Sequence, residues 1–448
     1  MTVPSDEELL FLALGGAGEI GMNLNLYGTA GKWLMVDLGI GFADSTMAGV
    51  EVVMQDPEFI VERRHDLVGI VLTHAHEDHL GAVADLWPRL KAPVYATPFA
   101  ASVLKRKLID AGLRDQVPVT EIPLGGKFSL SPFELEMITM THSILEPNAI
   151  AIRTKFGTIF HTGDWKIDTE PLLGDLTDEA MLKRIGDEGV LAMVCDSTNV
   201  FVEGQAGSES KVRVNVEKLV RGHSGRVAVS CFASNLARVE SIALAAVAAG
   251  RHPVLSGRAL TRMLESAQEC GYLLDFPECV PEKQAGYLPR DKVLFICTGS
   301  QGEPRASMSK LAGGEHRDLV LEAGDTAIFS SRVIPGNEHS VGRLQNALIA
   351  RGVKVITDRE AEIHVSGHPA RDELVRVYQW VRPRIALPVH GEVRHMIEHA
   401  ELAKTCQVPE TVVAPNGTLV RLAPGPAEII DHVFSGRLAR DGDTLIPL

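Results

Sequence analysis

The chain has 448 residues, 45% of them hydrophobic and 23% charged, which is typical of a soluble globular protein with two domains or one domain carrying a large insertion. Its formal net charge of −14 argues against a protein that coats nucleic acid through bulk positive charge. No apolar run approaches the ~18–20 residues that span a bilayer, and residues 1–8 lack the basic and apolar regions of a secretory signal, so we expect a cytoplasmic protein without a membrane partner.

The first part of the chain contains many short apolar runs bounded by glycine or polar turns, at residues 9–14, 33–36, 68–72, 149–152, 158–160 and 190–194. Regularly spaced short strands with few helical patterns predict that sheet packs on sheet here. The clearest helix is expected from Pro98 to Ala111, because Thr97 is a suitable N-cap, Pro98 suits the first helical position and Gly112 follows the end.

A polar cluster comes directly after the apolar run 68–72 and comprises His74, His76, Glu77, Asp78 and His79. On an extended backbone His74 and His76 point to the same side and can share one cation, while Asp78 and His79 follow a turn and can face a second cation. Imidazole and carboxylate ligands at this spacing suit zinc or another first-row metal. A solvated polar loop is the alternative, and three histidines with two acids in six positions favour the metal site.

Four further polar residues share this setting, since Asp37, His142, Asp164 and Asp196 each follow an apolar run. Each alone could cap a turn. Together, their repeated position at strand ends predicts that they converge on one rim of a sheet.

From about residue 226 the pattern changes to alternating strands and helices, with strands expected at 226–230, 252–255, 325–329 and 353–357 and helices at 236–249, 259–269 and 340–350. Such βα units are typical of an open parallel sheet whose ligands lie beyond the carboxyl ends of the strands. Two more units are expected to begin with strands at 363–365 and 385–389, and the residues after about 425 are expected to be loop-like. Residues 201–360 hold 20 Lys and Arg against 18 Asp and Glu, so a groove in this segment could accept a polyanion, although a neutral surface without a ligand explains the composition equally.

The six cysteines are scattered and form no Cys-x-x-Cys pair. Several stand inside apolar runs, so we expect all six to be core thiols rather than disulfide partners or zinc ligands.

Asp37, the run His74-x-His76-x-Asp78-His79, His142 and Asp164 together resemble the metallo-β-lactamase superfamily in order and separation. The resemblance implies an α/β fold, an αββα sandwich with two metal ions in the cleft between its sheets. It implies that His74, His76 and His142 hold one ion, that Asp78, His79 and a later histidine hold the other, and that Asp164 bridges both. Asp37 would orient the histidine loop from outside the ligand set.

Residues 196–199, 363–368 and 388–392 resemble the three motifs of the β-CASP group of nucleic-acid-processing members, and 232–235, 297–304 and 334–338 further resemble the bacterial ribonuclease J family. The match runs from about Leu9 to Val420. His390, in the third motif, supplies the later metal ligand and favours RNA, because DNA-processing members usually carry an aliphatic residue at that position.

The resemblance also implies a domain organisation. Residues 1–205 and 361–425 would form the metallo-β-lactamase domain, and 206–360 an inserted β-CASP domain built on a mostly parallel sheet. Residues 426–448 would begin the linker to a further C-terminal domain, which such family members ordinarily carry.

The expected activity is hydrolysis of RNA phosphodiesters by a hydroxide activated between two divalent ions, with Zn²⁺ expected and Mn²⁺ or Mg²⁺ as alternatives. Asp78 and Asp164 would support the hydroxide, and His368, held by Asp196, would act as general acid, with a structural histidine as the alternative. By resemblance, RNA and its 5′ monophosphate contact the following residues: Phe232, Ala233, Ser234, His364, Val365, Ser366, Gly367 and His368.

Stepwise 5′→3′ degradation of single-stranded RNA with a 5′ monophosphate is therefore expected in RNA decay and maturation, with endonuclease activity left open. The alternatives are a β-CASP endonuclease without 5′-end preference, a small-molecule hydrolase of the same superfamily and a non-catalytic RNA-binding scaffold. The family resemblance suggests a homodimer and a place in an RNA-degrading assembly.

Overall fold

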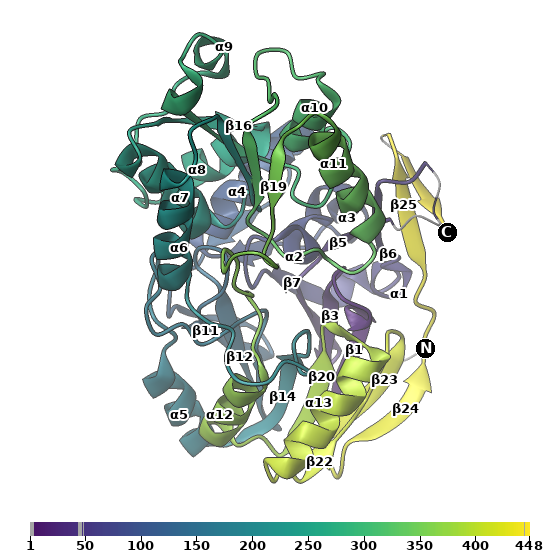
Figure 1. Cartoon of the computed structure of the whole chain (residues 1–448). Helices are drawn as coiled ribbons and strands as arrows, with labels where there is room; N and C mark the ends of the chain where they lie inside the picture. Colours follow the sequence, from purple (N-terminus) through teal and green to yellow (C-terminus); the bar gives the residue numbers. More distant parts are fainter. Residues whose placement is uncertain (1–3, 44–46, 48, 443) are drawn as a thin grey trace.

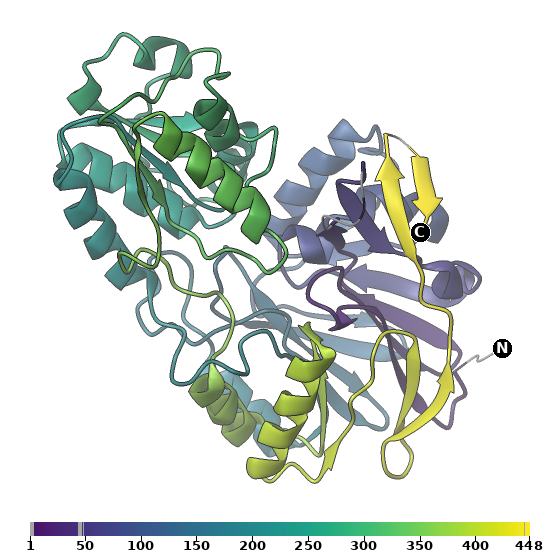
Figure 2. The same ribbon diagram turned by 45° about the vertical axis from the view of Figure 1, so that its right-hand side comes forward.

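The computed structural model describes residues 4–43, 47, 49–442 and 444–448. Two large sheets lie face to face (Figures 1 and 2). In spatial order, the eight-stranded sheet consists of β24 (Glu428–His432), β23 (Thr418–Ala423), β1 (Leu9–Gly15), β3 (Leu24–Thr29), β4 (Lys32–Val36), β7 (Leu67–Val71), β8 (Val94–Ala96) and β9 (Val119–Glu121). The seven-stranded sheet consists of β10 (Lys127–Leu130), β11 (Phe133–Thr139), β12 (Asn148–Thr154), β13 (Gly157–His161), β14 (Val190–Asp196), β20 (Ile385–Val389) and β22 (Glu410–Thr411).

Alternate residues of these strands enter different cores, because side chains of a strand point to opposite faces. Phe11 and Leu34 of the first sheet pack against Met137 and Ile150 of the second. The outer face of the eight-stranded sheet is covered by α3 (Val83–Leu90) and α4 (Pro98–Asp110). The outer face of the seven-stranded sheet is covered by α5 (Glu179–Glu188), α12 (Arg371–Val381) and α13 (Val393–Thr405). The predicted αββα sandwich is confirmed.

A separate parallel sheet is formed between β14 and β20 of the sequence and lies beside the sandwich (Figure 2). Its order is β16 (His252–Ser256), β17 (Val293–Cys297), β15 (Val227–Ser230), β18 (Thr326–Phe329) and β19 (Lys354–Ile356). One face packs on α6 (Glu209–Arg221) and α7 (Leu236–Ala248), and the other on α10 (Ser307–Gly313) and α11 (Glu338–Ala350). Next to it are α8 (Arg258–Glu269) and the short α9 (Glu282–Ala285).

The remaining helices and bridges are short, and several of them border the rim where the polar residues gather. They are α1 (Glu58–Val61), α2 (Glu77–Leu80), the 3₁₀ turns at Arg64–Asp66 and Arg290–Lys292, and the parallel pair β2 (Ala17–Gly18) and β21 (Gly391–Glu392).

Two sequence-based expectations about local structure are wrong. Residues 363–365 form no strand, since the carbonyl of Ile363 accepts hydrogen bonds from the side chains of Arg238 and Ser330 instead of a neighbouring strand. The last residues are not loop-like: they form β24 and the hairpin β25 (Arg437–Asp441) and β26 (Thr444–Pro447). That hairpin extends a sheet with β6 (Val52–Gln55) and β5 (Ile40–Phe42), and is drawn yellow in Figures 1 and 2.

All six cysteines are free in the structure. Cys195, Cys231 and Cys297 are buried as expected, but Cys270, Cys279 and Cys406 are only half-buried. Among the described residues, every helix is too short or too polar to cross a lipid bilayer.

Candidate metal centre

The polar residues predicted to converge do so at one rim of the two facing sheets. β4 and β7 run in parallel, as do β13, β14 and β20, so their carboxyl ends reach the same edge. Asp37 follows β4, His142 follows β11, Asp164 follows β13 and His390 follows β20. After β7, His74 and His76 lie in the loop, and the single turn of α2 carries Asp78 and His79. The rim therefore collects imidazoles and carboxylates from both sheets.

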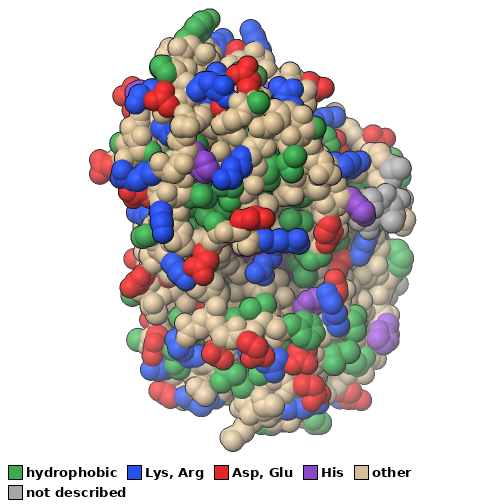
Figure 3. Space-filling model, in the orientation of Figure 1, with side chains coloured by type: hydrophobic (Ala, Val, Ile, Leu, Met, Phe, Trp, Pro, Cys, Tyr) green, Lys and Arg blue, Asp and Glu red, His purple; other side chains and the backbone are tan. Residues whose placement is uncertain are grey.

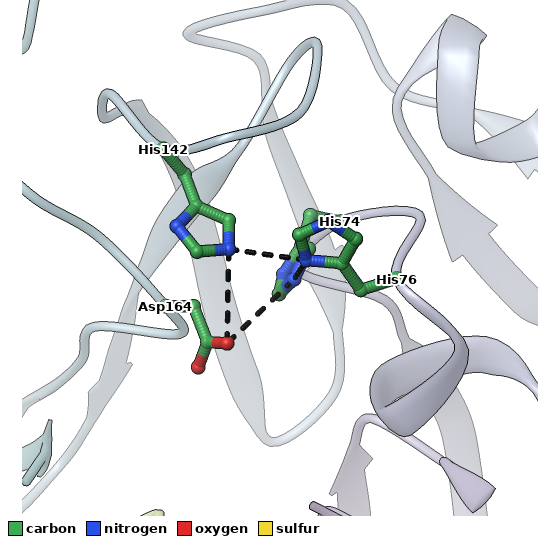
Figure 4. Close-up of side chains that lie close together, drawn as sticks. All are labelled: His74, His76, His142 and Asp164. Carbon is green, nitrogen blue, oxygen red and sulfur yellow. Dashed lines mark hydrogen bonds and ion pairs between the residues drawn. The ribbon is translucent and has the colours of Figure 1, made fainter. Parts of the chain in front are cut away.

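His74, His76, His142 and Asp164 form a first group whose ligand atoms all lie within 4.8 Å of one another. His76 Nδ1 is 3.0 Å from His74 Nε2 and 3.1 Å from His142 Nε2. The Oδ2 atom of Asp164 lies 3.9 Å from His74 Nε2 and 3.8 Å from His142 Nε2. Figure 4 shows these side chains pointing toward a shared space.

A second group, comprising Asp78, His79, Asp164 and His390, lies beside the first. His390 Nε2 is 3.7 Å from Asp78 Oδ2 and 3.5 Å from Asp164 Oδ2, and His79 Nε2 is 3.2 Å from Asp164 Oδ2. Asp164 thus belongs to both groups. Its other oxygen, Oδ1, is buried and has no hydrogen-bond partner among the described residues. Two sets of imidazole and carboxylate donors that share one carboxylate suit a pair of divalent ions.

The charges of this centre depend on burial and on close neighbours. Burial, together with adjacent imidazoles, lowers the pKa of His74 and of His142 well below the usual value, and burial lowers the pKa of His76 to about 4. These three rings are therefore neutral at physiological pH, the form in which imidazole binds a metal.

For His79 and Asp164 the charged neighbours, rather than burial, determine the direction of the pKa shift. Burial lowers the pKa of His79, but the carboxylates of Asp164, Asp78 and Asp37 outweigh it and raise the pKa well above the usual value. Burial raises the pKa of Asp164, but His390, His79 and His368 outweigh it and hold the pKa well below the usual value. The carboxylate that belongs to both groups is therefore ionised.

Two residues that the sequence analysis missed hold the ligands in place. Thr73 donates from its backbone N–H and its hydroxyl to Asp37, at 2.8 Å each, and Asp37 Oδ2 is 2.7 Å from His79 Nδ1. Asn23 bridges the second group, since its Nδ2 donates to the carbonyl of Asp78 and its Oδ1 lies 3.0 Å from His390 Nδ1. Both residues are buried. Asn23 follows a glycine-rich turn, a signal too general to identify it from the sequence.

Beside the two groups, His368 pairs with Asp196 at the end of β14. His368 Nδ1 lies 2.8 Å from Asp196 Oδ2 and 3.8 Å from Asp164 Oδ2. Burial lowers the pKa of His368, but Asp196 and Asp164 outweigh it and raise the pKa to about 9. The imidazolium form is therefore favoured at neutral pH, so the ring carries a proton that it can give up.

The predicted substrate residues divide into those that reach the centre and those that do not. Ser234 Oγ lies 3.1 Å from His76 Nε2, and the carbonyl of Gly367 lies 2.5 Å from His142 Nδ1. Ser366 Oγ accepts from Asn199 Nδ2 at 2.7 Å and from the N–H of His368 at 3.2 Å. A Cβ atom at Gly367 would stand 2.6 Å from Ser143 Oγ and 2.7 Å from the His142 ring, so this close approach requires glycine.

The other predicted substrate residues lie in the turn before α7 or against the inserted domain. Ala233 and Val365 pack against the core of the five-stranded sheet, and Phe232 lies in the turn that precedes α7. His364 Nδ1 is buried without a partner among the described residues, and burial lowers the pKa of His364 to about 3. Figure 3 shows Lys and Arg side chains interspersed with Asp and Glu across the middle of this face of the molecule.

Comparisons with known proteins agree with this architecture. Residues 224–348 match the model "Ribonuclease J, beta-CASP domain", residues 32–187 match "Beta-lactamase superfamily domain" and residues 352–415 match "Zn-dependent metallo-hydrolase RNA specificity domain".

Curated relatives cover almost the whole chain. A protein named Ribonuclease J from Sinorhizobium meliloti is 49% identical over 98% of this chain and 79% of its own length. The Ribonuclease J of Mycolicibacterium smegmatis is 40% identical over 96% of this chain and 77% of its own length. A crystal structure of a protein of unknown function from Enterococcus faecalis shares the fold, with a TM-score of 0.64, 13% identity, and coverage of 92% of this chain and 100% of that one.

Proposed function

Because the chain belongs to the ribonuclease J family and is a metal-dependent ribonuclease, we propose that it degrades RNA stepwise in the 5′→3′ direction and prefers a 5′ monophosphate. One observation carries the proposal: Asp164 is shared by two ligand groups, and the loop with Ser366 and Gly367 contacts one of them. A loop suited to phosphate beside these ligands would hold the 5′ end of the RNA at a fixed distance from the bond that is cleaved.

Two divalent ions would be held by the two groups. His74, His76 and His142 would bind one ion, Asp78, His79 and His390 the other, and Asp164 would bridge them. The donor chemistry fits a divalent ion. Oδ1 of Asp164 is buried and has no hydrogen-bond partner among the described residues, so a cation would be a suitable partner for it. Imidazole-rich ligand sets favour Zn²⁺, with Mn²⁺ and Mg²⁺ as alternatives. When bound, such a pair supplies a nucleophile of lowered pKa and neutralises charge on the phosphate.

The side chains of this centre would supply proton transfer and orientation. Because Nδ1 of His368 faces Asp196, its Nε2 is the position from which a proton can pass to the leaving oxygen. Asp196 is fully buried and would hold the ring in that orientation. Asp78 and Asp164 would orient the attacking water.

Phosphate at the 5′ end would be bound by Ser234, His364, Ser366 and Gly367, with Phe232, Ala233 and Val365 shaping the turns behind them. Hydroxyls and backbone N–H groups that converge on one place form a nest suited to an anion. A phosphate bound there would set one nucleotide over the centre in each cycle. Endonucleolytic cleavage would need RNA to pass the centre without capture of its end.

The domain boundaries at residues 205, 360 and 425 remain part of the proposal. The boundaries at 205 and 360 are supported by the parallel pairing of β14 with β20, which returns the chain to the seven-stranded sheet after the insertion. Cytoplasmic location, a homodimer and a place in an RNA-degrading assembly are predictions that follow from the family.

The test is digestion of one RNA sequence that carries a 5′ monophosphate, triphosphate or hydroxyl. We expect the monophosphorylated RNA to be shortened to mononucleotides fastest, and His76→Ala to abolish cleavage because a ligand is lost. His65→Ala, an exposed histidine that lies before β7 whereas the ligands follow that strand, serves as the matched control. Equal rates on all three ends would refute the end preference and favour the endonuclease alternative. Fewer than two bound ions per chain would contradict the two-metal assignment.

A further inference from the structure

Arg238 is a buried arginine of α7 that no step of the reaction uses. Its side chain is 1% exposed, and it donates from three nitrogens to acceptors on three separate segments. Nε and Nη2 bond both oxygens of Glu209 at 2.8 and 2.6 Å. Nη1 bonds the carbonyl of Ser330 at 2.8 Å, the hydroxyl of Ser330 at 2.9 Å and the carbonyl of Ile363 at 3.0 Å. A buried charge with this many partners fixes the segments that it joins.

On one side, this network holds the turn before α7. Glu209 Oε1 accepts from Asn235 Nδ2 at 2.9 Å, and Asn235 Oδ1 accepts from the N–H of Arg238 as the cap of the helix. The N–H of Asn235 donates to the carbonyl of Phe232, which closes residues 232–235 into a turn. Ser234, in that turn, reaches His76.

On the other side, the same guanidinium holds the loop of residues 363–368 at its first residue. Ser330 follows β18, and its hydroxyl donates to the carbonyl of Ile363 at 2.6 Å while it also accepts from Arg238. Gly367 and His368 follow four and five residues after Ile363, and the carbonyl of Gly367 lies 2.5 Å from His142 Nδ1. β15 and β18 are neighbours in the parallel sheet, and the loops that follow them leave from the edge where Arg238 lies.

The two anchored loops contact two ligands of the same group. His76 meets Ser234 and His142 meets Gly367, each through the ring nitrogen that points away from the other ligands. Hydrogen bonds of this kind orient a metal-binding imidazole and raise its basicity. The inserted domain therefore supports the centre through Arg238.

We propose that Arg238, paired with Glu209, is a positioning residue that fixes residues 232–235 and 363–368 relative to each other and so sets the distance between the 5′-phosphate contacts and the metal centre. The inference rests on the proposed function for its effect on RNA, but its structural part does not. Lysine cannot reproduce these contacts, because its donors all stand on one nitrogen. Arginine bonds both oxygens of Glu209 through two nitrogens and Ser330 and Ile363 through a third.

The experiment compares Arg238→Lys and Ser330→Ala with Arg251→Lys in the full chain. Arg251 is the matched control: it is 5% exposed and bonds the carbonyls of Gly225 and Val293 at the opposite edge of the same sheet. Hydrogen–deuterium exchange of the metal-free protein reports on the loops, and kcat and KM on 5′-monophosphate and 5′-hydroxyl RNA report on substrate placement.

Arg238→Lys is expected to raise exchange in residues 232–235 and 363–368 together by about tenfold, since both lose anchoring hydrogen bonds. Ser330→Ala removes the hydrogen bond from the Ser330 hydroxyl to Ile363, so it is expected to raise exchange in residues 363–368 alone. This variant keeps the test decisive if Arg238→Lys does not fold. The preference for 5′-monophosphate RNA in kcat/KM should fall about tenfold in Arg238→Lys and stay within about twofold in Arg251→Lys.

The possible results distinguish the positioning role of Arg238 from the proposed function. Unchanged exchange in both loops, or loosened loops with an unchanged end preference, would overturn the positioning role while leaving the proposed function in place. If the wild-type protein showed no preference for any 5′ end, the proposed function would be refuted. Hydrogen exchange in the two loops and the kcat of RNA cleavage would still show whether Arg238 positions them. If Arg251→Lys lost the preference equally, a general loss of stability would explain the result and the proposal would fail.

Discussion

Asp37 shows how one buried carboxylate orders the metal centre. It is fully buried and has a left-handed backbone with φ of 64°, a conformation that Asp tolerates better than most residues. This turn directs the carboxylate back onto Thr73 and His79. Two residues later, Gly39 passes so close to α2 that a Cβ atom would stand 1.7 Å from the carbonyl of Asp78, so no other residue fits. The position of His79 therefore depends on the conformation of residues 37–39.

At this scale we predict that Asp37→Asn weakens metal binding about 10- to 100-fold. A neutral amide has one accepting oxygen in place of two and accepts more weakly, so it cannot hold both Thr73 and the His79 ring as the carboxylate does. Competition with a chromogenic chelator measures the affinity. Asp66→Asn, at a half-exposed carboxylate that pairs with Lys32, is the control and should bind metal as the wild type does. Equal affinities in all three proteins would show that Asp37 does not orient His79.

The C-terminal hairpin is an element that belongs to the body of the fold. β25 pairs with β6 in antiparallel register, Leu438 opposite Met54, and Leu438 is 3% exposed within the core that also covers the outer face of the eight-stranded sheet. Arg437 pairs with Glu19, which also accepts from Gln55 and Asn416. Glu19 stands in the glycine-rich turn behind His390, whose N–H donates to Gly16. The hairpin is thus linked to the same turn as the second ligand group.

For this element we predict that Leu438→Ala lowers the free energy of unfolding by about 2–4 kcal/mol, because a buried leucine side chain is lost and a cavity remains. Ile446→Ala on β26, which is 44% exposed, should change it by less than about 0.5 kcal/mol. Urea unfolding followed by circular dichroism provides both values. If both variants lowered the free energy of unfolding by the same small amount, the hairpin would not pack on the core in solution.

Across the whole molecule, the candidate ligands connect parts that are far apart in sequence. His74, His76, Asp78 and His79 follow a strand of the eight-stranded sheet, whereas His142, Asp164 and His390 follow strands of the seven-stranded sheet. The inserted domain contributes Ser234 to the same place. Binding of ions at this rim would therefore join the two sheets and the insertion.

Accordingly, we predict that removal of divalent metal lowers the thermal unfolding midpoint. At a thousandfold excess of free metal over its dissociation constant, binding to the folded state alone stabilises it by about 4 kcal/mol. Calorimetry with and without a chelator measures the change in the unfolding midpoint. His390→Ala should show a smaller change, because one ligand is missing. Identical midpoints with and without chelator would contradict a role of the ions in holding the sheets together.

Local patterns in the sequence were enough to predict much of the fold and the site. Helix α7 follows Asn235, whose side chain caps it by accepting from the N–H of Arg238. Helix α4 begins at Pro98 and ends before Gly112 as predicted, but the Thr97 side chain makes no capping hydrogen bond, and Glu146 accepts from the N–H of Phe99 instead. The positions of Asp37, His142, Asp164 and His390 at strand ends follow from apolar runs and the polar residue after each. Their convergence could be predicted because parallel strands end at the same edge of a sheet.

Only the tertiary structure decided the features that depend on contacts between distant residues. Asn23 and Thr73 support the ligands through bonds that no local pattern marks. Residues 363–365 form no strand, because Arg238, more than 120 positions away, donates to the Ile363 carbonyl that a neighbouring strand would use. The hairpin at the C-terminus forms because β6, near the other end of the chain, offers it an edge. Strand and helix signals act over a few residues, whereas pairing and support of the site arise only when the folded chain brings remote segments together.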